Sequence, residues 1–463
     1  MCWNTTVEKH ILNNSYWLWL IHRSRDGVRT NVRLIAMFIG VWFAWGGFGL
    51  MLAPMLVAGP FHWKQVPPPP QRNGRMIAVR TVPALEEALR DAHPGDTIVL
   101  EEGIYTLDRT LWIVDKTHVT LCGRSRDPSK TILKGKGWGK PSDDYRTIAN
   151  QDLLVIRSSQ DILIANLTFA DGAHYGIRIG ADNDLSAPNP GGIHIYNCYF
   201  RDIATRAIKG VAMANRKPVS GGSVRFCVFE NTKVPDPSWS WAIYGGNYIS
   251  SIDMMYLEAW NFSDNLFLNI KGATGGGRGA IFVWNQSRNI VVERNVFVGC
   301  DRAIAFGNPS KPTGYQEGTL HVYDGIIRNN FIIVGANPHT TGVKGIEIVW
   351  VDNVQVHHNS IYAPDLQYRG IHFFQKIHRL HVANNLVRGR IDGEGDASLN
   401  GNVTGMLEGC FVNPQEGDLH LTEHATEALA KGVFLPAVKE DIDGERRRDP
   451  PEVGADERII GAR

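Results

Sequence analysis

The sequence has no surplus of charge of either sign, since 48 Lys and Arg residues face 47 Asp and Glu residues. The whole molecule is therefore not a polyelectrolyte binder, and any affinity for a charged ligand must come from local patterning. Cysteine is scarce, with six residues in 463, no CxxC pair, and no His at finger-like spacing. These absences exclude a disulfide-stapled scaffold and argue against a structural zinc site. We expect mostly buried thiols.

Helix-forming stretches are also few, whereas glycine is plentiful at 48 residues. Glycine accommodates tight turns, so this balance favours many short strands joined by turns. An apolar share of 43% is enough for a large core. The length allows two or three average domains, but a solenoid or barrel can use it as one unit.

One run lacks charged residues altogether, from Leu34 to Phe61. It is long enough to cross a bilayer as a helix, which needs about 20 apolar residues. Four arginines and a single aspartate lie in residues 23–33. The positive-inside tendency then keeps the N-terminus cytoplasmic and makes the rest periplasmic or extracellular. The alternative is a cleaved signal peptide and a secreted body, although Pro60 directly after the small residues 57–59 argues against cleavage there.

Four parts are predicted from this reading. Residues 1–33 form a cytoplasmic tail, 34–61 the transmembrane anchor or signal segment, 62–75 a Pro-rich linker, and 76–460 the body. The four prolines of residues 67–70 predict a stiff, extended spacer between membrane and body.

The body is a repeat of short apolar runs around an asparagine. The asparagines are Asn166, Asn197, Asn265, Asn295, Asn330, Asn359 and Asn385, and a weaker copy has Phe226 in their place. Between them recurs a small residue followed by Ile, at Gly176-Ile177, Ala207-Ile208, Ala242-Ile243, Ala280-Ile281, Ala303-Ile304, Gly345-Ile346 and Gly370-Ile371. Each unit thus contains two or three short period-2 strands, which can be buried only by stacking coil upon coil. We expect the asparagines in one column of turns, bonded to backbone and to each other.

Both ends of the repeat carry candidate caps. An amphipathic helix is predicted from about Pro83 to Ala92, and a short helix near Thr426–Lys431 is predicted as the other lid. Cys198 and Cys227 follow the asparagine position and are expected to be stacked core thiols. The predicted fold is all-β: a right-handed parallel β-helix with an N-terminal transmembrane helix and short capping helices.

The chain resembles the pectate-lyase-like superfamily of right-handed parallel β-helices. The likeness is carried by PGDTIVLEEGIYTL at Pro94–Leu107, by the asparagine coils, and by GDLHLTEHATEALAKG, DIDGERRR and EVGADE between Gly417 and Glu457. Together these stretches cover roughly residues 76–460. Such motifs specify the fold, but lyases, epimerases, hydrolases and non-catalytic surface proteins share it. The NTD, DD, GHG and RIK series of pectin hydrolases and the DPHD-type motif of alginate epimerases are absent.

A column of cations recurs beside the marker Ile. Two residues before it stand Arg206, Arg302, Lys344 and Arg369, with Trp241 in the same place and Arg278 one position early. Just after it stand Arg178, Lys209, Tyr244, Phe282, Glu347 and His372. Strands in a stack lie about 4.8 Å apart, so these side chains should form a ladder along one flank. The mixture of cations and aromatic faces would suit an extended acidic polysaccharide, whereas the plain alternative is ordinary surface Lys and Arg.

Elimination on a uronate needs a cation to neutralise the carboxylate and a base to remove the α-proton. Arg302, Lys344 and Arg369 are the predicted neutralising cations, and Lys344 or His372 is the predicted base. Arg206, Arg278, Trp241, Tyr244, Arg178 and Lys209 are predicted to bind substrate.

A partial likeness to chondroitinase-B-like lyases lies in VKGIEIVW, around Lys344 and Glu347. It implies a possible Ca²⁺ ligand at Glu347, although that family supplies two acidic ligands. His174 and Asp171 suggest a second polar cluster beside Arg178.

The leading hypothesis is an exported, membrane-anchored β-helix protein that acts on or binds an acidic polysaccharide, by β-elimination if it is an enzyme. The main alternative is a non-catalytic carbohydrate-binding or surface protein. A third is a glycoside hydrolase using Asp202 with Glu230 or Asp236. Nucleic acid is a poor fit to a body that faces away from the cytoplasm.

Overall fold

The computed structural model describes residues 64–70, 72–138, 152–180, 188–210, 218–235, 245–335 and 342–458. The chain divides into two compact units, Met1–Val57 and Ala58–Arg463, and the described residues all belong to the second. The predicted anchor at 34–61 lies outside the described residues. Within those residues, no helix has both the length and the apolar character that a membrane span requires.

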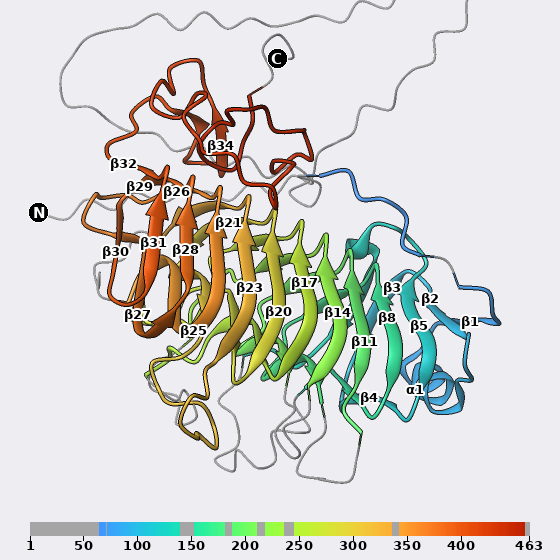
Figure 1. Cartoon of the computed structure of the whole chain (residues 1–463). Helices are drawn as coiled ribbons and strands as arrows, with labels where there is room; N and C mark the ends of the chain where they lie inside the picture. Colours follow the sequence, from blue (N-terminus) through green and yellow to red (C-terminus); the bar gives the residue numbers. More distant parts are fainter. Residues whose placement is uncertain are drawn as a thin grey trace, which may run out of the picture. The chain divides into compact units, whose positions relative to one another are not determined.

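The body is a stack of coils built from parallel strands, confirming the predicted all-β parallel β-helix (Figure 1). Each coil contributes strands to up to three ladders. Ladder one consists of β4 (Leu111–Val114), β7 (Leu154–Arg157), β10 (Tyr175–Ile179), β13 (Arg206–Gly210), β16 (Ser250–Met255), β19 (Ile281–Trp284), β22 (Arg302–Phe306), the first half of β25 (Lys344–His357), β27 (Arg369–His378) and β30 (Arg390–Gly393).

Ladder two lies beside it and shares β25. It consists of β1 (Met76–Val79), β2 (Thr97–Leu100), β5 (Thr117–Gly123), β8 (Gln160–Ala165), β11 (Gly191–Tyr196), β14 (Val219–Arg225), β17 (Leu257–Ser263), β20 (Ser287–Glu293), β23 (Val322–Arg328), the second half of β25, β28 (Leu380–Ala383) and β31 (Ala397–Asn400). Because β25 pairs in both ladders, ladders one and two form one 21-stranded sheet.

Ladder three is a separate sheet of 11 strands. It consists of β3 (Gly103–Thr106), β6 (Thr131–Lys134), β9 (Thr168–Ala170), β12 (Tyr199–Arg201), β15 (Val228–Glu230), β18 (Leu266–Leu268), β21 (Val296–Cys300), β24 (Phe331–Val334), β26 (Ser360–Tyr362), β29 (Leu386–Arg388) and β32 (Val403–Thr404).

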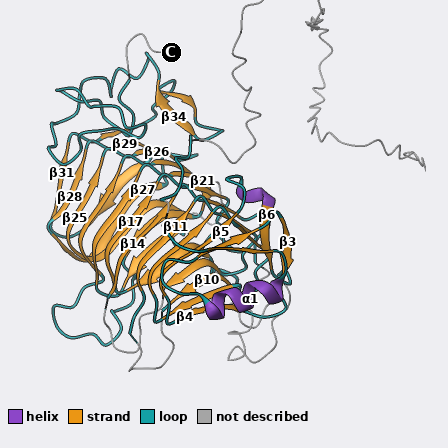
Figure 2. Ribbon diagram, turned by 90° about the vertical axis from the view of Figure 1, so that its right-hand side faces the viewer, coloured by secondary structure: helices purple, strands orange, loops and turns teal. Residues whose placement is uncertain are grey.

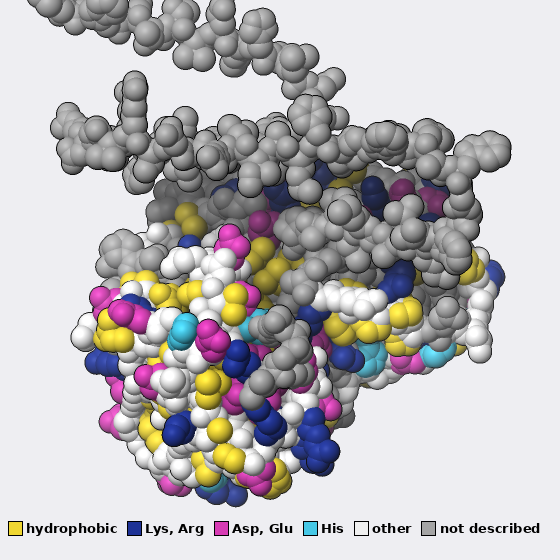
Figure 3. Space-filling model, turned by 90° about the horizontal axis from the view of Figure 1, so that it is seen from above, with side chains coloured by type: hydrophobic (Ala, Val, Ile, Leu, Met, Phe, Trp, Pro, Cys, Tyr) yellow, Lys and Arg dark blue, Asp and Glu magenta, His cyan; other side chains and the backbone are white. Residues whose placement is uncertain are grey.

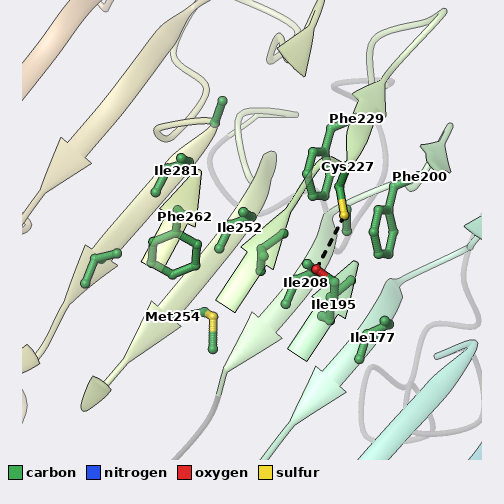
Figure 4. Packing of buried hydrophobic residues seen from close by; sticks show 14 of the residues in the cluster. Ile177, Ile195, Phe200, Ile208, Cys227, Phe229, Ile252, Met254, Phe262 and Ile281 are labelled. Carbon is green, nitrogen blue, oxygen red and sulfur yellow. Dashed lines mark hydrogen bonds between the residues drawn. The ribbon is translucent and has the colours of Figure 1, made fainter. Parts of the chain in front are cut away.

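The core runs through the centre of the stack in columns of like residues. Ile177, Ile208, Ile252 and Ile281 pair in register on successive strands of ladder one and lie in a row in Figure 4. Ladder three contributes a stack of phenylalanine rings, in which the Phe200 and Phe229 centroids are 4.8 Å apart. Parallel strands hold equivalent side chains one strand spacing apart, so a repeated residue stacks on its own copies.

The asparagines lie in two adjacent columns, so the prediction of a single column is wrong. Asn166 and Asn197 occupy the left-handed turn position, with φ of 56° and 49°. The other five lie one residue later, where each side-chain amide donates to the carbonyl of the next at 2.8–3.0 Å: Asn265, Asn295, Asn330, Asn359 and Asn385, with Asn402 as a further member. The sequence period hides the one-residue shift because both positions belong to the same turn.

The same correction applies to the predicted thiol column. Cys198 and Cys227 lie in the column of Asn265 and not after it, since the Cys227 amide donates to Asn265 Oδ1 at 2.9 Å. The Cys198 amide donates in turn to Cys227 Sγ at 3.4 Å. Every described cysteine is free and all but the half-buried Cys122 are buried, as predicted.

The first predicted cap is confirmed, because α1 (Val82–Asp91) lies against the first coils (Figure 2). Thr81 caps it by accepting a bond from the Ala84 amide, and Leu85 and Leu89 face the core. A short 3₁₀ helix, η1 (Pro128–Lys130), follows β5.

The second predicted cap is wrong in form and in place. Residues 426–430 make turns and no helix, because the Ala425 carbonyl closes only one turn, with the amides of Ala428 and Leu429. The tail instead forms a two-stranded antiparallel sheet of β33 (Phe411–Asn413) and β34 (Asp418–Leu421). Its apolar residues pack on the outer side of ladder three, and β31 in the last coil stays largely exposed.

The residues before β1 lie along the body. Lys64 Nζ donates to the Ile442 carbonyl at 2.7 Å and to Asp264 at 3.2 Å. Further along, the Pro67 carbonyl accepts from Tyr196 and Arg72 pairs with Asp161. Within 64–72 the predicted spacer is therefore fastened to the coils by hydrogen bonds.

Candidate functional site

The outer side of ladder one carries the predicted column. The residues after the inward Ile pair in register from strand to strand and are Arg178, Lys209, Asp253, Phe282, Ala305, Glu347, His372 and Asp392. One coil differs from the prediction, because the inward isoleucine of β16 is Ile252 and not the predicted Ile243. The equivalent positions are thus Ser250 and Asp253, and the predicted Trp241 and Tyr244 lie outside the described residues.

Five of the predicted site residues converge on three neighbouring strands. Arg302 pairs in register with Lys344, Lys344 with Arg369, and Glu347 with His372. Lys344 Nζ forms a hydrogen bond and ion pair with Glu347, and Arg302 Nη1 lies 3.3 Å from Glu347 Oε1. One buried carboxylate is therefore shared by two buried cations.

The next strand adds a second carboxylate that the sequence did not single out. Asp392 Oδ1 lies 3.1 Å from Arg369 Nε and 3.9 Å from His372 Nε2. Arg390 Nη2 lies 3.7 Å from Asp392 Oδ2. We call these seven residues the Lys344 cluster: Arg302, Lys344, Glu347, Arg369, His372, Arg390 and Asp392.

Burial and neighbouring charge set the protonation states in the Lys344 cluster. Burial lowers the pKa of Lys344, Arg302 and Arg369 lower it further, and Glu347 opposes the shift. Burial works to raise the pKa of Glu347, but Arg302 and Lys344 outweigh it and hold the pKa below its ordinary value. Burial, then Lys344 and Arg369, lower the pKa of His372 to about 4. His372 is therefore neutral at neutral pH, while Glu347 is charged.

The predicted Ca²⁺ ligand does not fit a calcium site. Both oxygens of Glu347 already face cations, Lys344 and Arg302, which would repel a divalent ion. Calcium takes six to eight oxygen ligands. Among the residues that the structure describes, the one group of three His, Cys or acidic residues close enough to share a metal ion is His420, Asp443 and Asp456, away from ladder one.

Aromatic rings border the Lys344 cluster on one side. The His372 ring stacks on Phe374 with centroids 4.7 Å apart and planes 25° from parallel. Lys344 Nζ lies 5.3 Å from the centroid of the same Phe374 ring. Such a ring offers an apolar face beside cations, a combination that binds a sugar ring and its acid group together.

A second cluster lies further toward the N-terminus on the same face. Asp253 is buried, and its carboxylate lies 2.6 Å from Arg206 Nε and 2.9 Å from Lys209 Nζ. Trp284 Nε1 also donates to it at 2.9 Å. Burial works to raise the pKa of Asp253, but Lys209 and Arg206 lower it to about 2. We call these residues the Asp253 cluster.

Two tyrosines complete the Asp253 cluster. The Arg206 guanidinium lies 3.8 Å from the centroid of the Tyr248 ring, and Tyr248 is hydrogen-bonded to Tyr175. Burial works to raise the pKa of Tyr248, but Lys209 and Arg206 outweigh it and lower the pKa below its ordinary value. Tyr248 is thus a phenol whose ionised form the cluster favours.

The polar group predicted around His174 has a different partner from the one expected. His174 Nδ1 lies 2.9 Å from Asp152, and Arg178 Nε lies 2.8 Å from the other oxygen of that carboxylate. Asp171 does not join them and instead lies 3.7 Å from Lys134. Arg278 lies on the same face, with its guanidinium 5.9 Å from the Phe282 ring centroid.

The charges of three described groups on this face do not cancel. In the Lys344 cluster, the Asp253 cluster and the Asp152–Arg178 pair, seven Lys and Arg residues face four carboxylates, leaving three more cations than anions. On the part of the body seen from above in Figure 3, in contrast, acidic, basic and hydrophobic side chains are interspersed. These three described groups therefore combine ordered charge with a positive surplus.

The carboxylates of the predicted hydrolase pair lie on ladder three and its turn. Asp202 accepts bonds from the Thr232 amide and hydroxyl, and Glu230 accepts from the Tyr199 hydroxyl. Asp236 lies outside the described residues. Each described carboxylate thus has a neighbour of its own, and neither belongs to the basic face.

Sequence reasoning missed Asp253, Tyr248, Trp284 and Asp392. Asp253 and Asp392 occupy the same position as Glu347 and His372, so the register would have found them once Ile252 and Ile391 were assigned as inward residues. Tyr248 precedes β16 by two residues and carries no periodic signal. Only the folded chain brings it onto Arg206.

No protein-family model and no curated protein matches the chain. Among solved structures, the alginate lyase from Paenibacillus sp. str. FPU-7 is 16% identical, with a TM-score of 0.44 over 70% of this chain and 97% of that one. Pectate lyase Pel9A is 10% identical, with a TM-score of 0.46 over 83% and 97%. The tailspike protein of E. coli bacteriophage HK620, solved with a pentasaccharide, is 13% identical, with a TM-score of 0.43 over 71% and 57%. The predicted resemblance to the pectate-lyase-like β-helices is confirmed at the level of the fold, which the parallel ladders of this chain establish by themselves.

Proposed function

We propose that this protein binds an acidic polysaccharide on the outer face of ladder one and cleaves it by β-elimination at the Lys344 cluster. The observation that carries the proposal is the convergence of Arg302, Lys344 and Arg369 on three neighbouring strands, where the first two pair with Glu347 and Arg369 pairs with Asp392. A uronate carboxylate has the same charge and shape as Glu347. The cluster has four cations against two carboxylates, and therefore has the cations needed to hold a third carboxylate, that of the substrate.

The chemistry follows from the protonation states. Arg302 and Arg369 neutralise the uronate carboxylate, which makes the proton on the adjacent carbon more acidic. His372 is neutral and accepts that proton, while Glu347 keeps Lys344 in its charged form beside it. The electron pair of the broken C–H bond forms the carbon–carbon double bond, the glycosidic C–O bond breaks, and the leaving oxygen takes a proton from Lys344.

The test is incubation of the full-length protein with alginate, pectate and glycosaminoglycans while ultraviolet absorbance is followed. An unsaturated uronate product raises the absorbance, and His372→Ala should slow the rise about 10²- to 10⁴-fold, the usual contribution of a general base. No rise with any uronate polymer, with or without added calcium, sinks the lyase proposal. New reducing ends without absorbance would instead indicate hydrolysis.

Non-catalytic binding is the second candidate, and one observation favours it. Arg206 and Lys209 are paired with Asp253 and almost fully buried, so they hold this part of the face in shape and are not available as catalytic groups. Lys344→Ala separates the two functions. Lost turnover with retained binding identifies an enzyme, while weaker binding with no turnover in either protein identifies a receptor.

We also propose that residues 34–61 anchor the protein and that the body is periplasmic or extracellular. The charge-free run and the preceding arginines support this orientation. Protease treatment of cells whose outer membrane, where present, has been removed should degrade the body and leave the tail protected, whereas a body that stays protected would reverse the proposed orientation.

A further inference from the structure

A cavity of about 600 Å³ lies at the corner where ladder one turns into ladder two. Its walls come from the loop between β22 and β23 and from β25 and β27. The aromatic walls are Tyr315, Tyr323 and Trp350. Its polar walls include Asp352, Lys376 and Arg379. A cavity of this size, with several rings and a few convergent polar groups, has the dimensions of a small-ligand site. We call it the corner pocket.

The aromatic walls are held in place by their own contacts. Tyr315 meets Trp350 edge to face, with centroids 5.6 Å apart and planes at 88°. Trp350 Nε1 donates to Gln375 at 3.0 Å. Tyr323 Oη accepts from the Leu320 amide at 2.8 Å, which fastens the loop over the cavity. The pocket is thus formed before a ligand arrives, which reduces the entropy cost of binding.

Two of the charged walls, Asp352 and Arg379, pair with each other, whereas the wall residues Lys376 and Glu317 have no ion pair within the described part of the chain. Arg379 makes a two-point ion pair with Asp352, at 2.7 and 2.6 Å. The Arg379 amide donates to Asp396 at 3.0 Å. Lys376 is exposed and has neither a hydrogen bond nor an ion pair within the described part of the chain. The pocket therefore offers aromatic faces together with one cation that is available to a ligand.

The corner pocket is continuous with the Lys344 cluster through Phe374. On one side Phe374 stacks on His372, and on the other it packs with Leu320, Val349 and Trp350. The same two strands carry both sites, since Lys344 and Trp350 both lie on β25, and Arg369 and Lys376 both lie on β27. A chain of sugars leaving the cluster along these strands would pass over Phe374 and reach the pocket.

We infer that the corner pocket is a carbohydrate subsite that binds a uronate residue of the same polysaccharide chain that is held at the Lys344 cluster. The sugar ring lies against Tyr315 and Tyr323, and its carboxylate pairs with Lys376. This inference rests on the proposed function and adds to it the position and the charge of a second bound residue.

The experiment measures the affinity of the full-length protein for hexamers of galacturonate, mannuronate and guluronate. For a hexamer that the wild type binds, Lys376→Gln should weaken binding about three- to tenfold, the range of one exposed or half-exposed ion pair. Tyr315→Ala should weaken it about tenfold through the lost ring contact. Lys130→Gln is the matched control, because Lys130 is an exposed lysine on η1 and should leave the affinity unchanged.

The outcomes separate the two proposals. If the wild type binds none of the hexamers, the proposed function fails. If it binds one and both pocket variants bind as tightly as the wild type and Lys130→Gln, the subsite is refuted while the proposed function stands. Lys376→Gln removes only an exposed charge, so its thermal unfolding should match the wild type and its binding result does not depend on folding.

Discussion

Replacing Glu347 with Gln removes the carboxylate on which the Lys344 cluster is organised. Glu347 is 1% exposed, and Arg302 Nη1 lies 3.3 Å from its Oε1. With an effective dielectric constant of about 20, this single attraction is about 5 kcal/mol before desolvation is subtracted. Removing one partner of a buried pair leaves the others uncompensated, and the measured cost is typically about 3–5 kcal/mol. We expect Glu347→Gln to lie near the lower end, about 3 kcal/mol, because Gln keeps the shape.

Urea unfolding at neutral pH measures this loss in Glu347→Gln, in Lys344→Met and in the double variant. The double variant should be less destabilised than the sum of the single ones, since it removes the charge left behind. The pKa of Glu347 is depressed, so its contribution is present above the unfolded-state pKa and is lost as the pH falls through the folded-state pKa. The difference between wild type and Glu347→Gln should therefore shrink in acid. Equal stability of both proteins at neutral pH would refute the shared-carboxylate reasoning.

Three further predictions concern the turn column, the tail and the proposed base. Asn330→Leu should cost about 3 kcal/mol or more in urea unfolding, since it leaves several buried bonding partners unsatisfied. The control Asn400→Ala, at an exposed position of β31, should change stability by less than about 0.5 kcal/mol, and similar losses in both variants would contradict the ladder. Burial works to lower the pKa of His420, but Asp418 and Asp443 raise it to about 10. Protonated His420 should therefore contribute its full stabilisation of the folded protein below about pH 6.5, and that contribution should be lost as the pH rises toward 10. The melting temperature should fall over that pH range in the wild type and fall less in His420→Gln. The same pH dependence of the melting temperature in both proteins would rule out a stabilising role for protonated His420. If His372 is the base, turnover of a uronate polymer should fall in acid with a midpoint near pH 4, and a midpoint near neutrality would exclude it.

The fold can be predicted from the sequence because several independent residue positions recur from repeat to repeat. The marker Ile and the turn asparagine both recur at the period of one coil, and a period-2 strand of that length buries its inner face only in a stack. The same recurrence predicts that Arg302, Lys344 and Arg369 share one face, and they do. Parallel pairing transmits register from coil to coil, so residue spacing alone brings these cations together.

The predicted column of outward residues on ladder one is wrong at the coil whose length differs from that of its neighbours. Ile208 and Ile252 pair although 44 residues separate them, against 29 between Ile252 and Ile281. Long loops cost little conformational free energy, so an insertion is tolerated and a chance Ala-Ile pair inside it imitates the marker. The predicted column therefore took Tyr244 in place of Asp253, the carboxylate around which Arg206 and Lys209 are paired.

The Ca²⁺ prediction at Glu347 had a different weakness. A sequence motif identifies a carboxylate that could bind a metal ion, but it does not show which Lys or Arg side chains of the protein already pair with that carboxylate. Lys344 is on the same strand, whereas Arg302 comes from the strand before, and both pair with the carboxylate. The balance of charges in a cluster is a property of three strands together, which no single segment of sequence displays.

The most direct test of the account is whether the protein recognises the carboxylates of its ligand. The measurement is the affinity of the full-length protein for a uronate polymer and for the same polymer after its carboxyl groups have been reduced to alcohols, with wild type and Arg369→Gln compared. The account predicts binding of the acidic polymer, loss of at least tenfold on carboxyl reduction, and a smaller loss in Arg369→Gln, which lacks one of the cations. Equal affinity of the wild type for the acidic and the reduced polymer would contradict it.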